Sequence, residues 1–272
     1  MRHVLSIAGS DSGGGAGIQA DLKTMCALGV YGMTAITAVT AQNTQGVYGV
    51  QEIEPAMVRA QIEAVYGDIR VDAVKVGMVS GAGIIAAVRE GLVRFGARNM
   101  VLDPVMVSKS GYSLLKREAE DAVRELAGIA DIITPNIPEA EILAGLRITG
   151  EDDALDAAER IAGLGAKSVL IKGGHRLGDA AEDLFYRDGK VLRLPARRIG
   201  TRHTHGTGCT LSTAIACRLA LGDGLEEAVR AAKAYITQAI ADSYELGAGC
   251  GPVGHLAALY RRAGMETEAQ KW

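Results

Sequence analysis

Short apolar runs and longer amphipathic segments follow one another along the chain in a regular order. The apolar runs predict strands at Val4–Ala8, Met33–Thr40, Ala73–Val76, Met100–Leu102, Ile132–Thr134 and Ser168–Ile171. The amphipathic segments predict helices at residues 18–28, Met57–Tyr66, Ile84–Phe95, Glu118–Leu126, residues 139–143 and Leu155–Leu164. Repeated β-α units of this length predict an α/β fold, in which a mostly parallel sheet carries helices on both faces.

The remaining segments complete one domain. Val47–Ile53 alternates in polarity and is interpreted as a short strand or a flap. Asp188-Gly189 predicts a hairpin, and therefore antiparallel pairing near the end of the sheet, between Asp183–Tyr186 and Val191–Leu194. Further helices are expected up to Leu221 and over Ala228–Leu246 and Leu256–Arg262. Since no linker divides the chain, we expect a single domain over residues 1–264 and a polar tail over 265–272.

Several polar side chains directly follow predicted strands. Right-handed crossovers place the carboxyl ends of parallel strands along one edge of the sheet, where ligands bind. We therefore expect one rim to carry residues that are far apart in sequence, namely Asp103, Asn136, Glu139 and Lys172. Gln42, at the end of the second strand, offers a donor and an acceptor that suit a neutral polar heterocycle.

The stretch Thr204–Ser212 places a glycine turn before a helix. Free backbone N–H groups and the positive end of the helix dipole make such a point a natural anion site. Cys209 falls in the first turn, where we expect a lowered thiol pKa and therefore a candidate base. The alternative is an ordinary helix start that carries glycines and a buried cysteine.

A second glycine cluster, Gly9–Gly17, follows the first strand. Its end, Gly15–Ala20, fits the G-x-G-x-x-A dinucleotide pattern, but Ala35–Gln42 lacks the acidic residue that this pattern requires. We interpret the loop as a place where a ligand approaches the backbone. Asp21, on the following helix, is either a solvated first-turn charge or a polar contact to that ligand.

Composition narrows the classes of partner. The 272 residues carry a formal net charge of −3 and 4% aromatic residues, so neither charge nor stacking surfaces favour nucleic acid or an acidic membrane. The four cysteines form no C-x-x-C pair, and no stretch reaches the roughly 18 apolar residues of a membrane span. These features predict a cytoplasmic protein with free thiols.

The expected rim suits phosphoryl transfer. That reaction needs charge stabilisation on the transferred group, a metal ion and a group that accepts a hydroxyl proton. Asp103 and Glu139 offer Mg²⁺ ligands, directly or through water, and Lys172 could lie along a polyphosphate. No Walker A or protein-kinase motif occurs in the sequence. The competing classes are nucleophilic catalysis by Cys209 with a histidine, and a small-molecule sensor that uses the same pocket without chemistry.

Seven sequence blocks, in order, carry a family likeness. They are Ile7–Lys23, Thr40–Thr44, Lys75–Met78, Leu102–Gly111, Thr134–Ala140, Lys172–His175 and Thr204–Thr210. With these blocks the chain resembles the ribokinase-like kinases, and among them the hydroxymethylpyrimidine/phosphomethylpyrimidine kinases of thiamine biosynthesis. The resemblance implies a three-layer α/β/α fold. It also implies two successive phosphorylations of 4-amino-5-hydroxymethyl-2-methylpyrimidine with Mg²⁺ and ATP.

The resemblance also implies site roles. Cys209 is the expected catalytic base, within an anion hole formed with Gly206, Thr207 and Gly208. The pyrimidine is expected to contact Gly9, Ala16, Asp21, Gln42, Met78 and Val105. ATP is expected to contact Lys172, Thr201 and His205, and Mg²⁺ is expected near Asp103, Asn136 and Glu139.

Two features leave alternatives open. Arg202-His203 replaces the Lys-Asn pair that is more usual in the family, which affects the expected contacts to adenine. Some family members phosphorylate pyridoxal or pyridoxine, so a pyridoxal kinase is the alternative activity. Gln42 favours the aminopyrimidine, because an amide can donate to and accept from its edge. A homodimer is the family expectation.

Overall fold

A nine-stranded sheet forms the centre of the computed structural model, which describes residues 1–107, 111–112, 114–173 and 181–265. The strands are β1 His3–Asp11, β2 Tyr31–Gln42, β3 Val47–Glu52, β4 Ala73–Val76, β5 Met100–Leu102, β6 Ile132–Ile133, β7 Val169–Ile171, β8 Asp183–Arg187 and β9 Lys190–Leu194. Their order across the sheet is β3-β2-β1-β4-β5-β6-β7-β8-β9.

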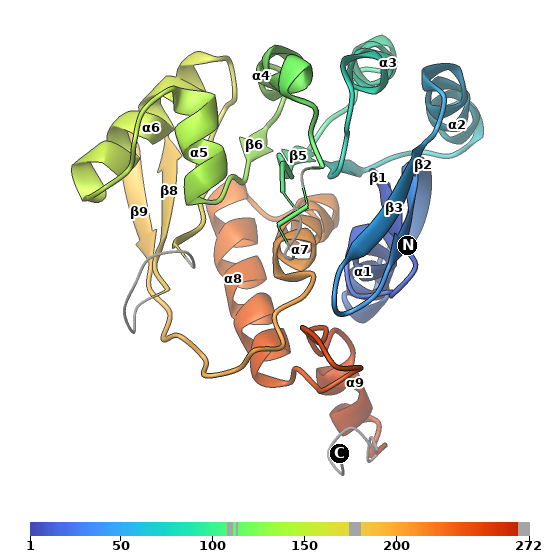
Figure 1. The fold of residues 1–272 in the computed structure, drawn as a ribbon, viewed down its shortest axis with the longest axis vertical. Helices are drawn as coiled ribbons and strands as arrows, with labels where there is room; N and C mark the ends of the chain where they lie inside the picture. Colours follow the sequence, from blue (N-terminus) through green and yellow to red (C-terminus); the bar gives the residue numbers. More distant parts are fainter. Residues whose placement is uncertain (108–110, 113, 174–180, 266–272) are drawn as a thin grey trace.

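Helices cover both faces of this sheet (Figure 1). On one face lie α2 Pro55–Asp68, α3 Ala82–Arg94, α4 Glu120–Ala127, α5 Ile137–Ala144 and α6 Glu151–Gly163, with the 3₁₀ turn Arg117–Ala119 before α4. On the other face lie α1 Gly17–Ala27, α7 Thr207–Leu221 and α8 Leu225–Ala241. A short α9, Ala257–Arg262, lies near the C-terminus. The structure therefore confirms the three-layer α/β/α sandwich.

Pairing along the sheet explains why one edge carries the site. The strands from β2 through β7 pair in parallel, whereas β3 and β8 run antiparallel to their neighbours. The predicted hairpin is confirmed, since Asp188 and Gly189 join β8 to β9 with φ angles of 50° and 75°. The carboxyl ends of the parallel strands consequently meet at one edge, as expected.

Neighbouring strand residues point to opposite layers. In β1, Val4 packs with α7 and α8, whereas Leu5 packs with the helices of the other face. In β6, Ile132 and Ile133 divide in the same way. Because strands in the middle of the sheet are buried on both faces, they are apolar at successive positions instead of alternating.

Several element boundaries differ from the predictions. β1 continues to Asp11, beyond the predicted end at Ala8, because it pairs with β2 through the first part of the glycine cluster. The helix predicted at Ala228–Leu246 runs from Leu225 and ends at Ala241. Directly after this end, Arg261 Nη1 donates to Asp242 Oδ1 at 2.7 Å. The chain then turns back, and Gly254 N–H donates to Ala239 O at 2.8 Å.

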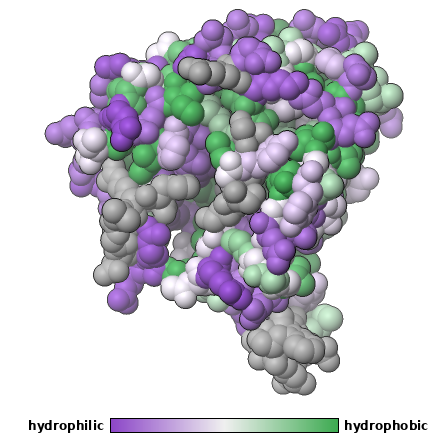
Figure 2. Space-filling view, viewed as in Figure 1, coloured by the Kyte–Doolittle hydropathy of each residue, from purple (hydrophilic) through white to green (hydrophobic). Residues whose placement is uncertain are grey.

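Some predicted features lie outside the described residues. They are His175, residues 108–110 of the Leu102–Gly111 block and tail residues 266–272. In the part of the chain that is described, none of the helices has the length and apolarity needed to cross a membrane. Polar and apolar residues are interspersed on the face seen in Figure 2.

We expect the core between the sheet and helices α2 to α6 to lose stability when one of its buried side chains is shortened. Leu92 on α3 is 1% exposed, whereas Leu221 at the end of α7 is 41% exposed. Leu92→Ala should lower the free energy of unfolding by about 2–5 kcal/mol, because it removes buried surface and leaves a cavity. Leu221→Ala, the same change at a helix surface, should cost less than about 1 kcal/mol. Urea denaturation measures both, and equal losses would contradict this placement of the core.

Candidate active site

The N-terminus of α7 lies against the glycine loop that follows β1. Gly206 caps this helix with φ 81°, and a Cβ at that position would overlap the carbonyl oxygen of Gly15. A left-handed conformation and this close approach both require glycine. The N–H of Thr207 donates to Thr204 O at 3.3 Å, and those of Gly208 and Cys209 follow in the first turn of α7 beside the loop, as an anion site requires.

A buried ion pair stands next to this helix N-terminus. Lys172, just after β7, places Nζ 2.7 Å from Oδ1 of Asp103, which follows β5. A Cβ at Gly208 would lie 3.4 Å from Lys172 Nζ and 3.5 Å from Asp103 Oδ2. The structure thus brings together the predicted anion site, Lys172 and Asp103, from three separate parts of the sequence.

Each member of this pair shifts the pKa of the other toward its charged form. Burial by itself would raise the pKa of Asp103, but Lys172 and Lys75 together hold it below its usual range. Burial would likewise lower the pKa of Lys172, and Asp103 and Glu139 raise it above its usual value. Both groups are therefore charged at neutral pH, and a cation stands at the anion site.

Asn136 and Glu139 organise the start of α5. The Asn136 side chain accepts from Glu139 N–H at 2.9 Å, and the Glu139 carboxylate accepts from Asn136 N–H at 2.8 Å, which is a capping box. Glu139 Oε2 also lies 4.0 Å from Lys172 Nζ. Burial, together with the charge of Asp103, raises the pKa of Glu139 to about 7, although Lys172 acts in the opposite direction.

The residues expected to hold Mg²⁺ form a partial donor set. Among the described residues, no group of three or more His, Cys, Asp or Glu side chains is placed to hold a metal. Asn136 uses its side-chain oxygen in the capping box, so two carboxylates remain, Asp103 and Glu139, on either side of Lys172. Mg²⁺ keeps several waters and often binds through one or two carboxylates plus substrate phosphates, which these residues fit.

Three of the expected substrate residues, Gly9, Gln42 and Met78, lie at or near the ends of β1, β2 and β4. A Cβ at Gly9 would lie 2.9 Å from Met78 Sδ, so the Met78 side chain packs on bare backbone. Thr37 Oγ1 donates to Met78 O at 2.6 Å and holds that segment against β2. Ala16 begins α1, and Val105 is partly exposed two residues after Asp103. Gly9 and Met78 are thus brought into contact, as the shared role predicts.

The backbone N–H groups of the glycine loop donate hydrogen bonds to the side chain of Asp11. Its carboxylate accepts from the N–H groups of Gly13 at 2.8 Å, Gly15 at 3.0 Å and Ala16 at 2.8 Å. Burial would raise the pKa of Asp11, but the bond from His205 and these amides lower it below its usual range. The loop is therefore closed around a side chain of its own, which the sequence analysis did not foresee.

His205 lies on the predicted substrate side. Its Nε2 atom is 2.9 Å from Asp11 Oδ2 and 3.3 Å from Gln42 Nε2. Its ring also covers Gly15, where a Cβ would overlap it. In the structure His205 thus contacts the glycine loop and Gln42, one of the residues expected at the pyrimidine, whereas the sequence pattern had placed it with ATP. The backbone path from β9 to α7 decides this orientation, which no local pattern reveals.

Asp21 lies behind the site surface. Its side chain is fully buried, and its oxygens bind Lys75 Nζ at 2.8 and 3.0 Å, Ser6 Oγ at 2.5 Å and Thr213 Oγ1 at 2.7 Å. Neither sequence interpretation holds here, since Asp21 is neither solvated nor open to a ligand in this structure. The sequence analysis assigned no role to Lys75. The feature of the sequence that could have identified Lys75 is that it is the single charged residue in an otherwise apolar strand, Ala73–Val76.

The environment of Cys209 corrects the expected direction of its pKa. Burial raises the pKa of the thiol to about 11, and Asp21 and Asp103 add to this, whereas Lys75 and the N–H of Gly17 lower it. The helix N-terminus alone had predicted a lowered pKa. Because surrounding protein outweighs that effect, the sulfur is a thiol at neutral pH in the ligand-free structure.

The segment before α7 is held by the chain that follows α8. Thr201 Oγ1 lies 3.1 Å from Ser243 Oγ, and Gly251 N–H donates to His203 Nδ1 at 3.1 Å. Arg202 turns away to Glu245 at 2.5 Å. The unusual Arg202-His203 pair therefore makes contacts within the protein, to the chain after α8.

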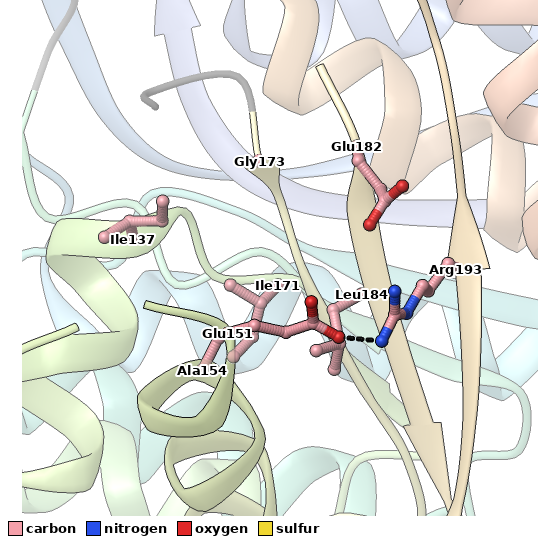
Figure 3. Close-up of a pocket in the computed structure, with 8 residues that line it drawn as sticks. All are labelled: Ile137, Glu151, Ala154, Ile171, Gly173, Glu182, Leu184 and Arg193. Carbon is pink, nitrogen blue, oxygen red and sulfur yellow. Dashed lines mark ion pairs between the residues drawn. The ribbon is translucent and has the colours of Figure 1, made fainter. Parts of the chain in front are cut away.

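A separate pocket lies between α6 and the end of the sheet (Figure 3). Glu151 and Arg193 form an ion pair across it, and Ile137, Ala154, Ile171 and Leu184 supply apolar walls. None of the residues predicted for the site lines this pocket, although Gly173 at its rim follows Lys172. The pocket is therefore distinct from the rim at α7.

The fold and the site together define a kinase of the ribokinase-like class. Residues 11–254 match the family model described as phosphomethylpyrimidine kinase, and the chain belongs to that family. A Rhizobium meliloti (strain 1021) protein named hydroxymethylpyrimidine/phosphomethylpyrimidine kinase is 55% identical over 92% of this chain and 96% of its own.

Two solved structures share the fold closely. The phosphomethylpyrimidine kinase of Clostridium difficile 630 is 48% identical, with a TM-score of 0.79 over 88% of this chain and 100% of its own. The ADP complex of Bacillus subtilis pyridoxal kinase is 41% identical, with a TM-score of 0.89 over 95% of this chain and 99% of its own. Both branches considered from the sequence are thus structurally similar to this chain.

The two ends of α7 allow a matched test of the helix N-terminus. Gly206 and Gly222 both have positive φ, but a Cβ at Gly206 would overlap Gly15 whereas Gly222 has open space around it. Gly222→Ala should cost about 1 kcal/mol through backbone strain alone. Gly206→Ala should cost more and should also weaken ADP binding at least tenfold, because α7 must move away from the loop. Denaturation and calorimetry measure both, and equal ADP affinities would contradict this account.

Proposed function

We propose that this protein phosphorylates 4-amino-5-hydroxymethyl-2-methylpyrimidine, first to the monophosphate and then to the pyrophosphate, with ATP as donor. This is a step in thiamine biosynthesis. The observation that carries the proposal is that the α7 N-terminus meets the Lys172–Asp103 pair, where a Cβ on Gly208 would lie 3.4 Å from Lys172 Nζ and 3.5 Å from Asp103 Oδ2. The chain that carries this site is a phosphomethylpyrimidine kinase family member. The ADP complex of a similar kinase supports ATP as the donor.

The proposed transfer follows from these groups. The hydroxymethyl oxygen forms a bond to the γ-phosphorus of ATP, and the bond from that phosphorus to the bridging oxygen breaks with its electron pair on ADP. The hydroxyl proton passes to the sulfur of Cys209 in its thiolate form. The N–H groups of Gly208 and Cys209, with Lys172, stabilise the charge on the transferred group. Since the transition state is loose, the proton leaves late.

Mg²⁺ is the cofactor that the family implies. Asp103 and Glu139 would hold it through water beside the phosphates, and Asn136 orients Glu139 through the capping box. When bound, Mg²⁺ neutralises charge on the phosphate oxygens. Lys172 already neutralises part of the charge of both carboxylates, which fits water-mediated binding better than direct ligation.

The pyrimidine is placed at the ends of β1, β2 and β4. Met78 and Val105 pack on the ring, and the backbone at Gly9 and Ala16 lines its edge. Gln42 reads the amino group and ring nitrogen. His205 is assigned here to the orientation of Gln42 instead of to ATP, because its ring contacts Asp11 and Gln42.

Thr201 keeps its proposed place on the nucleotide side. The assignment of Asp21 changes from substrate contact to support of Lys75, because its carboxylate is buried. A homodimer stays a prediction, supported by apolar side chains exposed on β2 and β3, namely Tyr31, Val39 and Tyr48. A cytoplasmic location likewise stays a prediction.

The alternative activity is phosphorylation of pyridoxal or pyridoxine. It is favoured by the high structural similarity to Bacillus subtilis pyridoxal kinase. Both substrates present a hydroxymethyl group on a ring of similar size, so the same α7 N-terminus would serve either. The two differ at the ring edge that Gln42 reads.

A direct assay separates these activities. The purified protein, incubated with the aminopyrimidine alcohol, Mg²⁺ and ATP, should form the monophosphate and then the diphosphate, followed by mass spectrometry. Turnover of pyridoxine under the same conditions should be slower. Turnover of pyridoxine alone would transfer the assignment to the alternative, and pyrimidine binding without ATP consumption would support a sensor.

Cys209 allows two linked measurements. Cys209→Ala should keep ADP affinity while kcat falls about 10²–10⁴-fold, the usual range for loss of a general base. Since the thiol pKa is about 11, the thiolate fraction rises with pH, so kcat/KM of the unaltered protein should increase between pH 6 and 9. Cys209→Asp, with a carboxylate ionised at lower pH, should flatten this increase. Identical pH profiles for the two proteins would exclude Cys209 as the base.

A further inference from the structure

Lys75 is a buried charge that the transfer step as described does not use. In β4 it shares a face with Ala73, and this face packs against α7. Its side chain is 0% exposed. An isolated ammonium at such a position would be very unfavourable, so its partner decides its state. That partner is Asp21 of α1, at 2.8 Å.

The Lys75–Asp21 pair joins four elements below the site. Asp21 also accepts from Ser6 of β1 and from Thr213 of α7. Although burial would lower the pKa of Lys75, Asp21 raises it above its usual value, and the ammonium stays charged. Buried ion pairs of this kind are often no more stabilising than apolar residues of the same volume. Stability alone therefore does not account for a charge at this position.

The positive charge of Lys75 affects the pKa of the Cys209 thiol. Asp21 connects Lys75 to Thr213, which lies one turn after Cys209 on α7. Lys75 is the main positive group that lowers the pKa of the Cys209 thiol, and the backbone N–H of Gly17 lowers it further. The other charged groups around the sulfur are Asp21 on α1 and Asp103 after β5, which oppose a thiolate, and Lys172 after β7. Gly17 holds its amide in place, because its φ of 56° and its approach to Gly9 O exclude a side chain.

We propose that Lys75 is a positioning residue that, with the Gly17 amide, stabilises the thiolate of Cys209, the form able to take the hydroxyl proton of the substrate. This inference rests on the proposed role of Cys209 as base. The hydroxyl oxygen uses its electron pair for the new bond to phosphorus, and its proton moves to the sulfur. The thiol then loses that proton to solvent before the next cycle. Asp21 holds the ammonium below the sulfur.

The reactivity of Cys209 without any substrate tests the proposal. Only the thiolate reacts with iodoacetamide, so the rate at a fixed pH reports its fraction. Loss of a close opposite charge moves a pKa by about 1–3 units, so Lys75→Met should slow alkylation of Cys209 at pH 9 by about 10- to 1000-fold. Fragment ions of the tryptic peptide distinguish Cys209 from Cys217.

A matched control separates charge from loss of structure. Lys233 on α8 forms another largely buried pair, with Asp183 at 2.6 Å. Lys233→Met should lower the melting temperature yet leave the alkylation rate of Cys209 unchanged. If Lys75 had only a structural role, Lys75→Met would loosen the packing and expose the Cys209 sulfur. Alkylation would then become faster, whereas our proposal predicts that it becomes slower.

A double variant covers the case in which Lys75→Met alone does not fold. Lys75→Met with Asp21→Asn removes both charges, so no unpaired charge is left buried. Its alkylation should be slower than in the unaltered protein, because the variant leaves no ammonium at this position to stabilise a thiolate. Alkylation as fast as in the unaltered protein, or the same slowing in Lys233→Met, would overturn the proposal.

Catalysis supplies a second readout. The double variant should show a lower kcat with an unchanged KM for the pyrimidine, and its kcat/KM should begin to rise only at higher pH. A raised KM with an unchanged kcat would overturn the positioning role. Because the alkylation experiment contains neither ATP nor pyrimidine, it stands even if the proposed kinase substrate is wrong.

Discussion

The close approach of the α7 N-terminus to the glycine loop after β1 governs the rest of the site. At this crossing the backbone of Gly206 lies so near Gly15 that neither side chains nor solvent fit between them. The contact sets where the first turn of α7 points, and therefore where an anion is stabilised. Because Cys209 lies in that same first turn, one backbone contact positions both the proposed anion hole and the proposed base.

Around this crossing, charge is arranged in two layers. The outer layer is Lys172 between Asp103 and Glu139, which faces the phosphates in the proposed function. The inner layer is the fully buried pair Lys75 and Asp21 beneath the sulfur. In the outer layer Lys172 opposes the effect of burial on Asp103, and in both layers the pKa of the lysine is raised by the carboxylates beside it. The two layers belong to one electrostatic unit, since Lys75 also acts on Asp103.

Sequence reasoning worked where the signal was periodic or local. The buried strands and the hairpin at Asp188-Gly189 follow from short-range rules. The gathering of Asp103 and Lys172 followed from topology, because parallel strands end at one edge. The C-terminal end of α8 was harder to predict, because the helical pattern of Ala228–Leu246 continues beyond Asp242, where Arg261 of α9 binds and the helix ends.

The sequence by itself determined the order of strands and helices, the family of this chain and the glycine positions at which α7 begins. These depend on patterns of neighbouring residues, which act over one or two turns of chain. Only the tertiary structure decided the raised pKa of Cys209, the turn of His205 toward Asp11, and the pairing of Lys75 with Asp21. Each of these depends on burial and on charges from distant segments, and burial exists only once the sheet and its helices have packed.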